Sequence, residues 1–146
     1  MSRRLRELFK AAQTEGRALF IPYVTGGYPA REDTVPILLA LEAGGADVIE
    51  IGVPFTDPLA DGATIQHANH IAVEHGITLH DCFGFVREAR AQGLKAPVLF
   101  MGYYHPVLAL GEGRAALECA GSGVDGLLIV ERYTERGGGW VARGAP

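Results

Sequence analysis

The sequence predicts an α/β protein built around a parallel sheet, and three features of the 146-residue chain lead to this prediction. Apolar runs of strand length alternate with segments in which apolar residues recur at the helical period. The apolar runs are continuous, as is typical of strands that are buried on both faces. Loops that carry polar and aromatic residues follow these runs. This order calls for parallel strands joined by right-handed helical crossovers.

A helix and a short strand open the chain. Leu5, Leu8, Phe9 and Ala12 recur at the spacing of a single helical face. Residues 18–24 form a short apolar run that ends in a Gly- and Pro-containing loop, and they predict a buried strand.

The next helix has recognisable signals at both ends. Asp33 or Thr34 can cap its start, and Pro36 fits its first turn, where a missing N–H costs little. Gly44-Gly45 suits a left-handed C-cap at its end.

Further strands and helices alternate to residue 130. Thr78 and Asp81 resemble a capping box at the start of one of these helices. The remaining predicted elements are a strand over 47–53, helices over 63–76 and 79–93, a strand over 97–101, a helix over 114–120 and a strand over 124–130.

Four strand–helix units fit either a doubly wound sheet or a (β/α)8 TIM barrel. The loops at 23–29, 54–61 and 102–106 all follow strands, and this favours the barrel, whose active site collects at the carboxyl ends of its strands. A complete barrel needs about 250 residues. Residues 1–130 are therefore expected to form an incomplete barrel of about four βα units. Residues 131–146 lack apolar periodicity and are expected to be a divergent, disordered tail.

Composition narrows the class of protein. A formal net charge of -4 argues against a nucleic-acid-binding protein, and no apolar run approaches the roughly 18 residues of a membrane span. Cys82 and Cys119 lack a disulfide framework and are expected to be buried free thiols in the cytoplasm. The Arg-rich residues 1–13 allow a mitochondrial transit peptide as an alternative, but Glu7 and the apolar stripe favour a first structural helix.

Three acidic residues are candidates for chemistry. Glu50 lies inside an apolar strand, so its carboxyl group is either partnered by an Arg or Lys, exposed at the strand end, or raised in pKa by desolvation for catalysis. Asp57 and Asp61 lie in a Pro- and Gly-rich loop, where acids also serve as turn formers. The residues by themselves leave these alternatives open.

A histidine cluster is a weaker candidate. His67, His70 and His75 share one predicted helix, but no acid or cysteine is placed to complete a metal site. A solvated helical face is expected instead, and no metal is predicted.

Three motifs resemble the α-component of tryptophan synthase. They are the run from Glu50 to Gly62 followed by Thr64-Ile65-Gln66, the run Tyr23-Val24-Thr25-Gly26-Gly27-Tyr28-Pro29, and Met101-Gly102-Tyr103-Tyr104. Their order and spacing agree with the family from about residue 5 to residue 130. The sequence is most similar in character to fungal members of the family, in which the α- and β-components are fused in one polypeptide. By this resemblance residues 1–130 are the N-terminal half of the family's TIM barrel.

The resemblance implies an activity and its catalytic residues. The family carries out the last step of tryptophan biosynthesis, in which the α-reaction cleaves indole-3-glycerol phosphate to indole and glyceraldehyde 3-phosphate. Glu50 then corresponds to the catalytic glutamate, a general acid that protonates the indole C3 atom. Asp61 corresponds to the catalytic aspartate, which accepts a hydrogen bond from the indole N–H and stabilises the charge that develops there.

The resemblance also implies binding residues and a partner. Tyr23 and Tyr103 are expected to bind the indole ring, with ordinary barrel packing as the alternative. Asp57 lies in the loop that contacts the β-component in the family. No cofactor is expected for this chain, because pyridoxal phosphate belongs to the β-component.

The sequence departs from the family pattern in three places. Ala63 stands where the family usually has Pro, and His105 where it usually has Asn. After Val130 the expected Asp-Leu-Pro-Pro run is missing, and an out-of-frame or retained-intron ending is one hypothesis.

Three hypotheses for the function of the chain are considered. The first is an α-type lyase whose activity is impaired, because the late phosphate-binding loops are missing. The second is an inactive fragment that binds the β-component or misassembles. The third, a different sugar-phosphate barrel enzyme, is disfavoured by the Glu50 and Asp61 motif.

Overall fold

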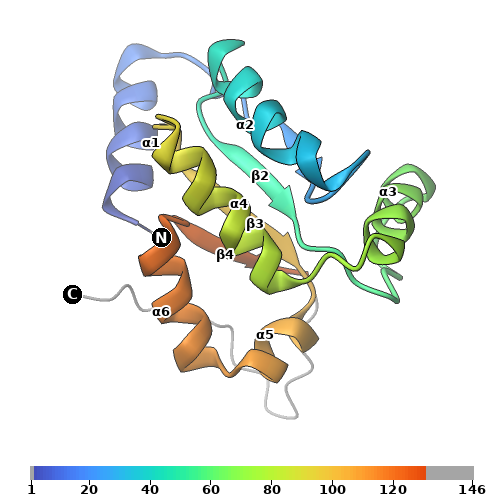
Figure 1. Ribbon diagram of the computed structural model, residues 1–146. Helices are drawn as coiled ribbons and strands as arrows, with labels where there is room; N and C mark the ends of the chain where they lie inside the picture. Colours follow the sequence, from blue (N-terminus) through green and yellow to red (C-terminus); the bar gives the residue numbers. More distant parts are fainter. Residues whose placement is uncertain (1, 131–146) are drawn as a thin grey trace.

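A four-stranded parallel sheet forms the centre of the protein (Figure 1). The computed structural model describes residues 2–130. The strands are β1 (Tyr23–Thr25), β2 (Ile49–Gly52), β3 (Val98–Gly102) and β4 (Gly126–Ile129). They lie in the order β1-β2-β3-β4, and each pairs in parallel with its neighbour in the chain. A doubly wound sheet reverses its strand order at a switch point, so this order favours the barrel.

Helices cover one face and both ends of the sheet. They are α1 (Arg3–Glu15), the 3-10 turn η1 (Arg31–Asp33), α2 (Thr34–Ala43), α3 (Ala63–Glu74), α4 (Leu79–Ala91), α5 (Tyr104–Leu110) and α6 (Glu112–Ser122). Helix α4 lies between α2 and α6 over the sheet, while α3 stands beyond the carboxyl end of β2 (Figure 1). Helix α1 lies at the opposite end, where the Ser2 N–H donates to the Asp125 carbonyl oxygen.

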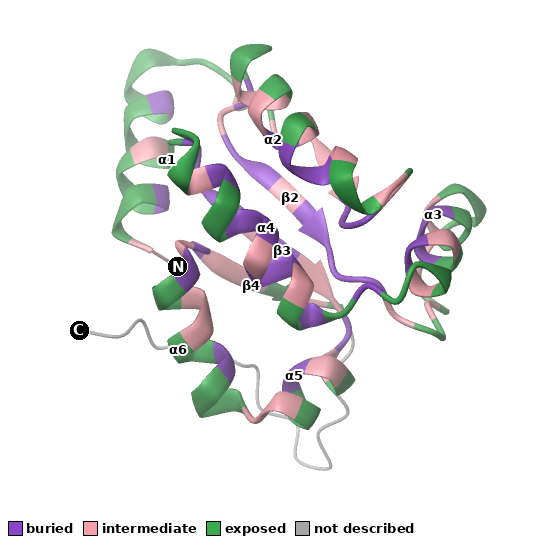
Figure 2. Cartoon of the chain, viewed as in Figure 1, coloured by how far each residue is buried: buried purple, intermediate pink, exposed green. Residues whose placement is uncertain are grey.

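The core lies between the sheet and these helices. In the register of the sheet, Val24, Ile51, Phe100 and Leu127 form one row that faces the helices. Phe83 of α4 packs on Phe100 with ring centroids 5.2 Å apart. The buried positions of α2 and α4 face the strands (Figure 2). Burial of this apolar surface makes the largest favourable contribution to the stability of the four βα units.

The other face of the sheet is more open, as expected for an incomplete barrel but not for strands that are buried on both faces. Tyr23, Glu50, Leu99 and Gly126 form its first row, and all four are half-buried. Leu128, further along β4, is 40% exposed. In a closed barrel, side chains from strands on opposite sides fill this face in layers. Residues 2–130 supply only one side of such layers.

Predicted helix ends agree with the structure. Thr78 and Asp81 form the expected capping box at the start of α4. Glycines with positive φ follow α2, α3 and α4, at Gly45, Gly76 and Gly93. Glycine adopts a positive φ with little free-energy cost, so it can follow the last turn of a helix without backbone strain.

The first strand is shorter than the predicted run over 18–24. Phe20 is 54% exposed, and β1 begins only at Tyr23. The chain before β1 still runs beside β2, since the Asp47 N–H donates to the Phe20 carbonyl oxygen at 2.9 Å and the Glu50 N–H to that of Pro22. Pro22 has no N–H with which to extend the ladder, so regular pairing begins after it.

Helix α5 was missed, because residues 102–106 were expected to be a loop. Pro106 is the third residue of this helix. A proline in the first helical turn removes only an N–H that has no partner inside the helix, so it does not prevent the helix from forming. The predicted tail at 131–146 lies outside the described residues.

Candidate active site

Glu50 is held by the middle of the sheet. It lies on β2 between Tyr23 of β1 and Leu99 of β3, on the open face. Its side chain has no hydrogen bond or ion pair with any residue in the range 2–130. Within this range the ion-pair alternative for Glu50 therefore does not hold. A half-buried carboxyl group without a protein partner can exchange a proton with a bound molecule.

Asp61 follows the same strand and is held by other elements. Its Oδ2 atom accepts hydrogen bonds from Asn69 Nδ2 of α3 and from the Tyr103 hydroxyl, both at 3.4 Å. Its backbone carbonyl accepts from Gln66 Nε2 at 2.8 Å. The Tyr103 hydroxyl also accepts the Ala60 N–H at 2.9 Å. The end of the loop is therefore anchored both to α3 and to the segment after β3.

An aromatic stack supports the start of the same loop. Phe55 stacks on Tyr103 with centroids 5.0 Å apart and on His105 with centroids 5.7 Å apart. Tyr103 is only 5% exposed. The structure thus places Tyr103 beside Asp61, with its ring packed against the loop and its hydroxyl bonded to it. His105, one of the departures from the family pattern, takes part in this stack.

Tyr23 is the first residue of β1 and does not follow the end of that strand, contrary to the expectation. Its hydroxyl is 3.3 Å from Thr25 Oγ1, and its ring covers Gly52, where an added Cβ would lie 2.0 Å from that hydroxyl. Burial raises the pKa of Tyr23, and the negative charge of Asp61 acts in the same direction. The hydroxyl is thus neutral and lies within electrostatic reach of Asp61 and Tyr103.

Asp57 lies apart from this cluster, at the tip of the loop. Both Asp57 and Leu59 are exposed, and Leu59 exposes 74% of its surface. The Leu59 N–H donates to the Asp57 carbonyl oxygen at 2.9 Å, which gives the tip a tight turn. The tip projects a carboxylate and an apolar side chain that no other part of residues 2–130 covers.

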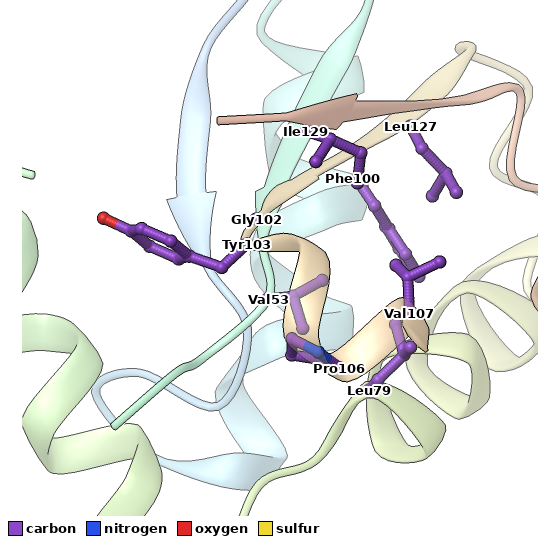
Figure 3. A pocket seen from close by; sticks show the side chains of 9 residues that line it. All are labelled: Val53, Leu79, Phe100, Gly102, Tyr103, Pro106, Val107, Leu127 and Ile129. Atoms are coloured by element: carbon purple, nitrogen blue, oxygen red, sulfur yellow. The ribbon is translucent and has the colours of Figure 1, made fainter. Parts of the chain in front are cut away.

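A small cavity lies on the helix-covered side of the sheet, away from Glu50. Its volume is about 10 Å³, and the lining residues are Val53, Leu79, Phe100, Gly102, Tyr103, Pro106, Val107, Leu127 and Ile129. The Tyr103 ring points away from the other lining side chains (Figure 3). A space of this size holds one water molecule at most, and its apolar lining offers that water no partners. The cavity is a packing gap beneath α5.

Sequence reasoning missed Asn69. This residue is 3% exposed and bonds to two parts of the loop, the Phe55 N–H at 3.2 Å and the Asp61 carboxylate. A signal was present, because Asn69 falls on the same helical stripe as Ile65, Ala68 and Ala72. A polar residue on an apolar stripe needs a buried partner.

The remaining polar candidates on α3 and elsewhere do not form a site. His67 and His70 are exposed, and His70 contacts Glu74 at 3.3 Å. Over residues 2–130, no three His, Cys, Asp or Glu side chains are grouped so as to hold a metal ion.

Both cysteines are free, and burial raises the pKa of Cys82 to about 12. None of the described helices has the length and apolar character needed to cross a membrane.

Comparisons with known proteins identify the family. The family model for the tryptophan synthase alpha chain matches residues 9–137. The alpha chain of Chloroflexus aggregans is 49% identical over 126 residues, which are 86% of this chain and 47% of that protein. Tryptophan synthase of Saccharomyces cerevisiae is 44% identical over 131 residues, which are 90% of this chain and 18% of that protein.

Solved structures agree. The crystal structure of tryptophan synthase subunit alpha from Legionella pneumophila superposes with a TM-score of 0.86 at 34% identity, covering 90% of this chain and 50% of that one. The chain spans about half the length of the alpha chains that it matches. From the motifs, the strand order and these matches, the chain belongs to the tryptophan synthase alpha chain family, and its fold is part of that family's TIM barrel, about four βα units.

Proposed function

We propose that this chain supplies the two catalytic carboxylates of the α-reaction, the cleavage of indole-3-glycerol phosphate to indole and glyceraldehyde 3-phosphate. One observation carries the proposal. Glu50 has no side-chain partner among residues 2–130 and lies on the open face of β2, while Asp61, beyond the end of that strand, is held by Asn69 and Tyr103. Two carboxyl groups in different environments suit two different tasks, proton transfer and charge stabilisation.

Glu50 is the proton-transfer group in this proposal. In its acid form it donates a proton to the indole C3 atom, which leaves a positive charge on the ring nitrogen. The resulting carboxylate then takes the proton of the hydroxyl group on the adjacent side-chain carbon. The bond from C3 to that carbon breaks, its electrons return to the ring, and the carbon becomes the aldehyde. Glu50 ends the cycle protonated, so acid and base steps balance.

Asp61 stabilises the charge that forms in the first step. Two donors already occupy its Oδ2 atom, and Oδ1 has no partner in the described part of the chain. An ionised carboxylate fixed before the reaction stabilises a developing positive charge without having to reorganise. In this proposal Oδ1 accepts the ring N–H.

A β-component is the proposed protein partner. The exposed tip of the loop, with Asp57 and Leu59, is the contact surface. The yeast relative, of which this chain spans 18%, is long enough for both components to be fused. No proton transfer described above needs a cofactor, and pyridoxal phosphate belongs to the β-component in this proposal.

A hybrid protein tests the proposed chemistry. Residues 1–130 are joined to the rest of the Chloroflexus aggregans alpha chain, in place of its matching segment. We expect this hybrid to release indole from indole-3-glycerol phosphate. Glu50→Gln and Asp61→Asn are each expected to lower kcat by roughly 10²-fold or more, because each removes a charge or proton that the reaction needs. Indole release is followed by chromatography.

Glu32→Gln is the matched control, because Glu32 is an exposed carboxylate in η1, remote in sequence from the loop. It should retain the activity of the hybrid. Circular dichroism checks that each variant is folded. Substantial activity in folded Glu50→Gln would contradict the assignment of the acid.

A binding role is the second candidate, and the exposed tip at Asp57 and Leu59 favours it. In that case the 146-residue chain forms a stable complex with a β-component but releases no indole. Co-purification of the two chains, with and without Leu59→Ser, distinguishes this role from catalysis.

A further inference from the structure

The buried amide of Asn69 bridges both ends of the loop between β2 and α3. Its Oδ1 atom accepts the Phe55 N–H at 3.2 Å, and its Nδ2 atom donates to Asp61 Oδ2 at 3.4 Å. The residues between these anchors include Thr56, Asp57 and Leu59, which are exposed. A buried amide is costly to desolvate, and both ends of this one are used.

The two donors to Asp61 converge on the same oxygen. Asn69 Nδ2 and the Tyr103 hydroxyl both contact Oδ2, and Oδ1 has no hydrogen bond to any of residues 2–130. Two donors from different elements, α3 and the segment after β3, restrict the rotation of the carboxylate group. The orientation of Oδ1 is therefore set by α3 and by the segment after β3, and not by Asp61 itself.

We propose that Asn69 is a positioning residue, whose amide turns the Asp61 carboxylate so that Oδ1 accepts the ring N–H of the substrate. This inference rests on the proposed function, because it assigns that N–H to Asp61. It adds a role for a residue outside the catalytic pair. Asn69 does not touch the reacting atoms and acts only through Asp61.

The test is a comparison of two ligands that differ at the ring nitrogen. One is 3-(indol-3-yl)propyl phosphate, a substrate analogue without the hydroxyl groups, and the other is its N1-methyl derivative. Dissociation constants are measured by calorimetry for the hybrid protein. The ratio of the two constants reports the N–H contact, and a general loss of folding or phosphate binding changes both constants alike.

Four results are expected if Asn69 positions Asp61. The hybrid prefers the N–H ligand, and Asp61→Ala loses that preference. Asn69→Ala lowers the preference about tenfold while the affinity for the N-methyl ligand stays within about twofold. Asn69→Asp lowers it as well, because its carboxyl group either repels that of Asp61 or shares a proton with it, so Asp61 is no longer the oriented, ionised acceptor.

A second measurement uses the 146-residue chain itself. Hydrogen exchange of the Phe55 N–H should be slow in the wild type and in Asn69→Asp, which keeps the acceptor oxygen. It should be fast in Asn69→Ala. Asn69→Asp therefore separates anchoring of the loop from orientation of the carboxylate.

The outcomes distinguish this inference from the proposed function. If Asp61→Ala keeps the preference for the N–H ligand, the proposed role of Asp61 is wrong. If Asp61→Ala loses it while Asn69→Ala and Asn69→Asp both keep it, the catalytic assignment stands and the positioning role of Asn69 is overturned. Equal weakening of both ligands in the Asn69 variants would show a merely structural role and would also overturn it.

Discussion

At the scale of single residues, two glycines near the candidate site are needed because other side chains pack directly against their Cα atoms. Gly27 has φ +82°, and a Cβ there would lie 2.3 Å from Ile77 Cγ1. Its N–H donates to Thr34 Oγ1 at 2.8 Å, in a region where Thr34 is fully buried. Gly52 lies under Tyr23 in the same way, on the strand that holds Glu50. The turn after β1 and the packing of Tyr23 on β2 therefore require a glycine, at Gly27 and at Gly52 respectively.

Gly27→Ala is expected to destabilise the protein by about 3 kcal/mol. The cost combines an unfavourable left-handed backbone with a clash against Ile77, and each contributes roughly 1–3 kcal/mol. Urea unfolding of the 146-residue chain measures the difference.

Gly84→Ala is the control, because Gly84 lies inside α4 and a Cβ there meets nothing within 4 Å. This control should gain about 0.5–1 kcal/mol through the lower entropy of the unfolded chain. Equal stability of the two variants would contradict both the left-handed backbone at Gly27 and its close contact with Ile77.

At the scale of elements, α4 shows how local and distant contacts combine at a helix start. The Thr78 hydroxyl accepts the Asp81 N–H, and the Asp81 carboxylate accepts the Thr78 N–H at 2.9 Å. Arg31 of η1 adds an ion pair to the same carboxylate. Burial opposes ionisation of Asp81, but the hydrogen bonds from Thr78 and Arg31 outweigh it and lower the pKa of Asp81.

This lowered pKa predicts a pH-dependent effect of Asp81→Asn. The folded state binds the Asp81 proton less tightly than the unfolded state does. The contribution to stability is therefore present above the unfolded value of about 4 and is lost as the pH falls through the lower folded value. Asp81→Asn should cost about 1 kcal/mol at pH 6 and much less at pH 3. Urea unfolding at both pH values measures this.

Glu88→Gln is a suitable comparison, because Glu88 is an exposed acid on the same helix. Its effect should stay within about 0.5 kcal/mol at pH 6 and pH 3. A cost of Asp81→Asn that is the same at both pH values would refute the charge-based account.

At the scale of the whole molecule, a buried acid joins distant parts of the chain at the amino end of the sheet. Asp125 precedes β4, and its side chain is only 5% exposed. Its carboxylate accepts from Ser2 Oγ at 2.7 Å, from the Val98 N–H at 3.0 Å and from Arg90 Nη2 at 3.2 Å. One carboxylate thus connects the start of α1, the start of β3 and helix α4.

Asp125→Ala is expected to cost about 3–5 kcal/mol, because it leaves the half-buried Arg90 without its ion-pair partner and the buried Val98 N–H without its acceptor. Hydrogen exchange should also become faster in α1, whose start depends on Ser2. Glu7→Ala breaks an ion pair with Arg3 on exposed side chains, where solvent screens the charges, and should leave stability almost unchanged. Similar costs for the two variants would argue against a structural role for Asp125.

The open face of the sheet also belongs to this scale. Tyr23, Glu50 and Leu99 are half-buried there, and Leu128 is exposed. The alpha chains in the comparisons are about twice as long as the segment matched here. In those barrels side chains from other strands fill the corresponding face. The proposed roles of Glu50 and Asp61 are therefore best tested with that layer supplied, as in the hybrid.

The sequence by itself determined the order of the strands and of the helices other than α5, and the positions where several helices end. Those features arise from periodicity, capping and glycine φ, which act over a few residues, and so Thr78, Gly45 and Gly93 could be interpreted directly. The family also followed from the sequence, through motifs around Glu50 and Asp61. The length of β1 and the presence of α5 were not predicted correctly. Pro22 cannot donate to the ladder, so β1 begins only after it, and Pro106 lies in the first turn of α5, where a proline is tolerated.

Only the tertiary structure decided which side chains support the candidate site. Asp61 takes its two donors from Asn69 and from Tyr103, which lies 42 positions away, and Asp125 bonds to Ser2 across 123 positions. It also showed that Glu50 has no ion pair among residues 2–130 and that its face of the sheet is open. Such contacts depend on which elements meet in space, and no local rule of spacing or propensity specifies that meeting.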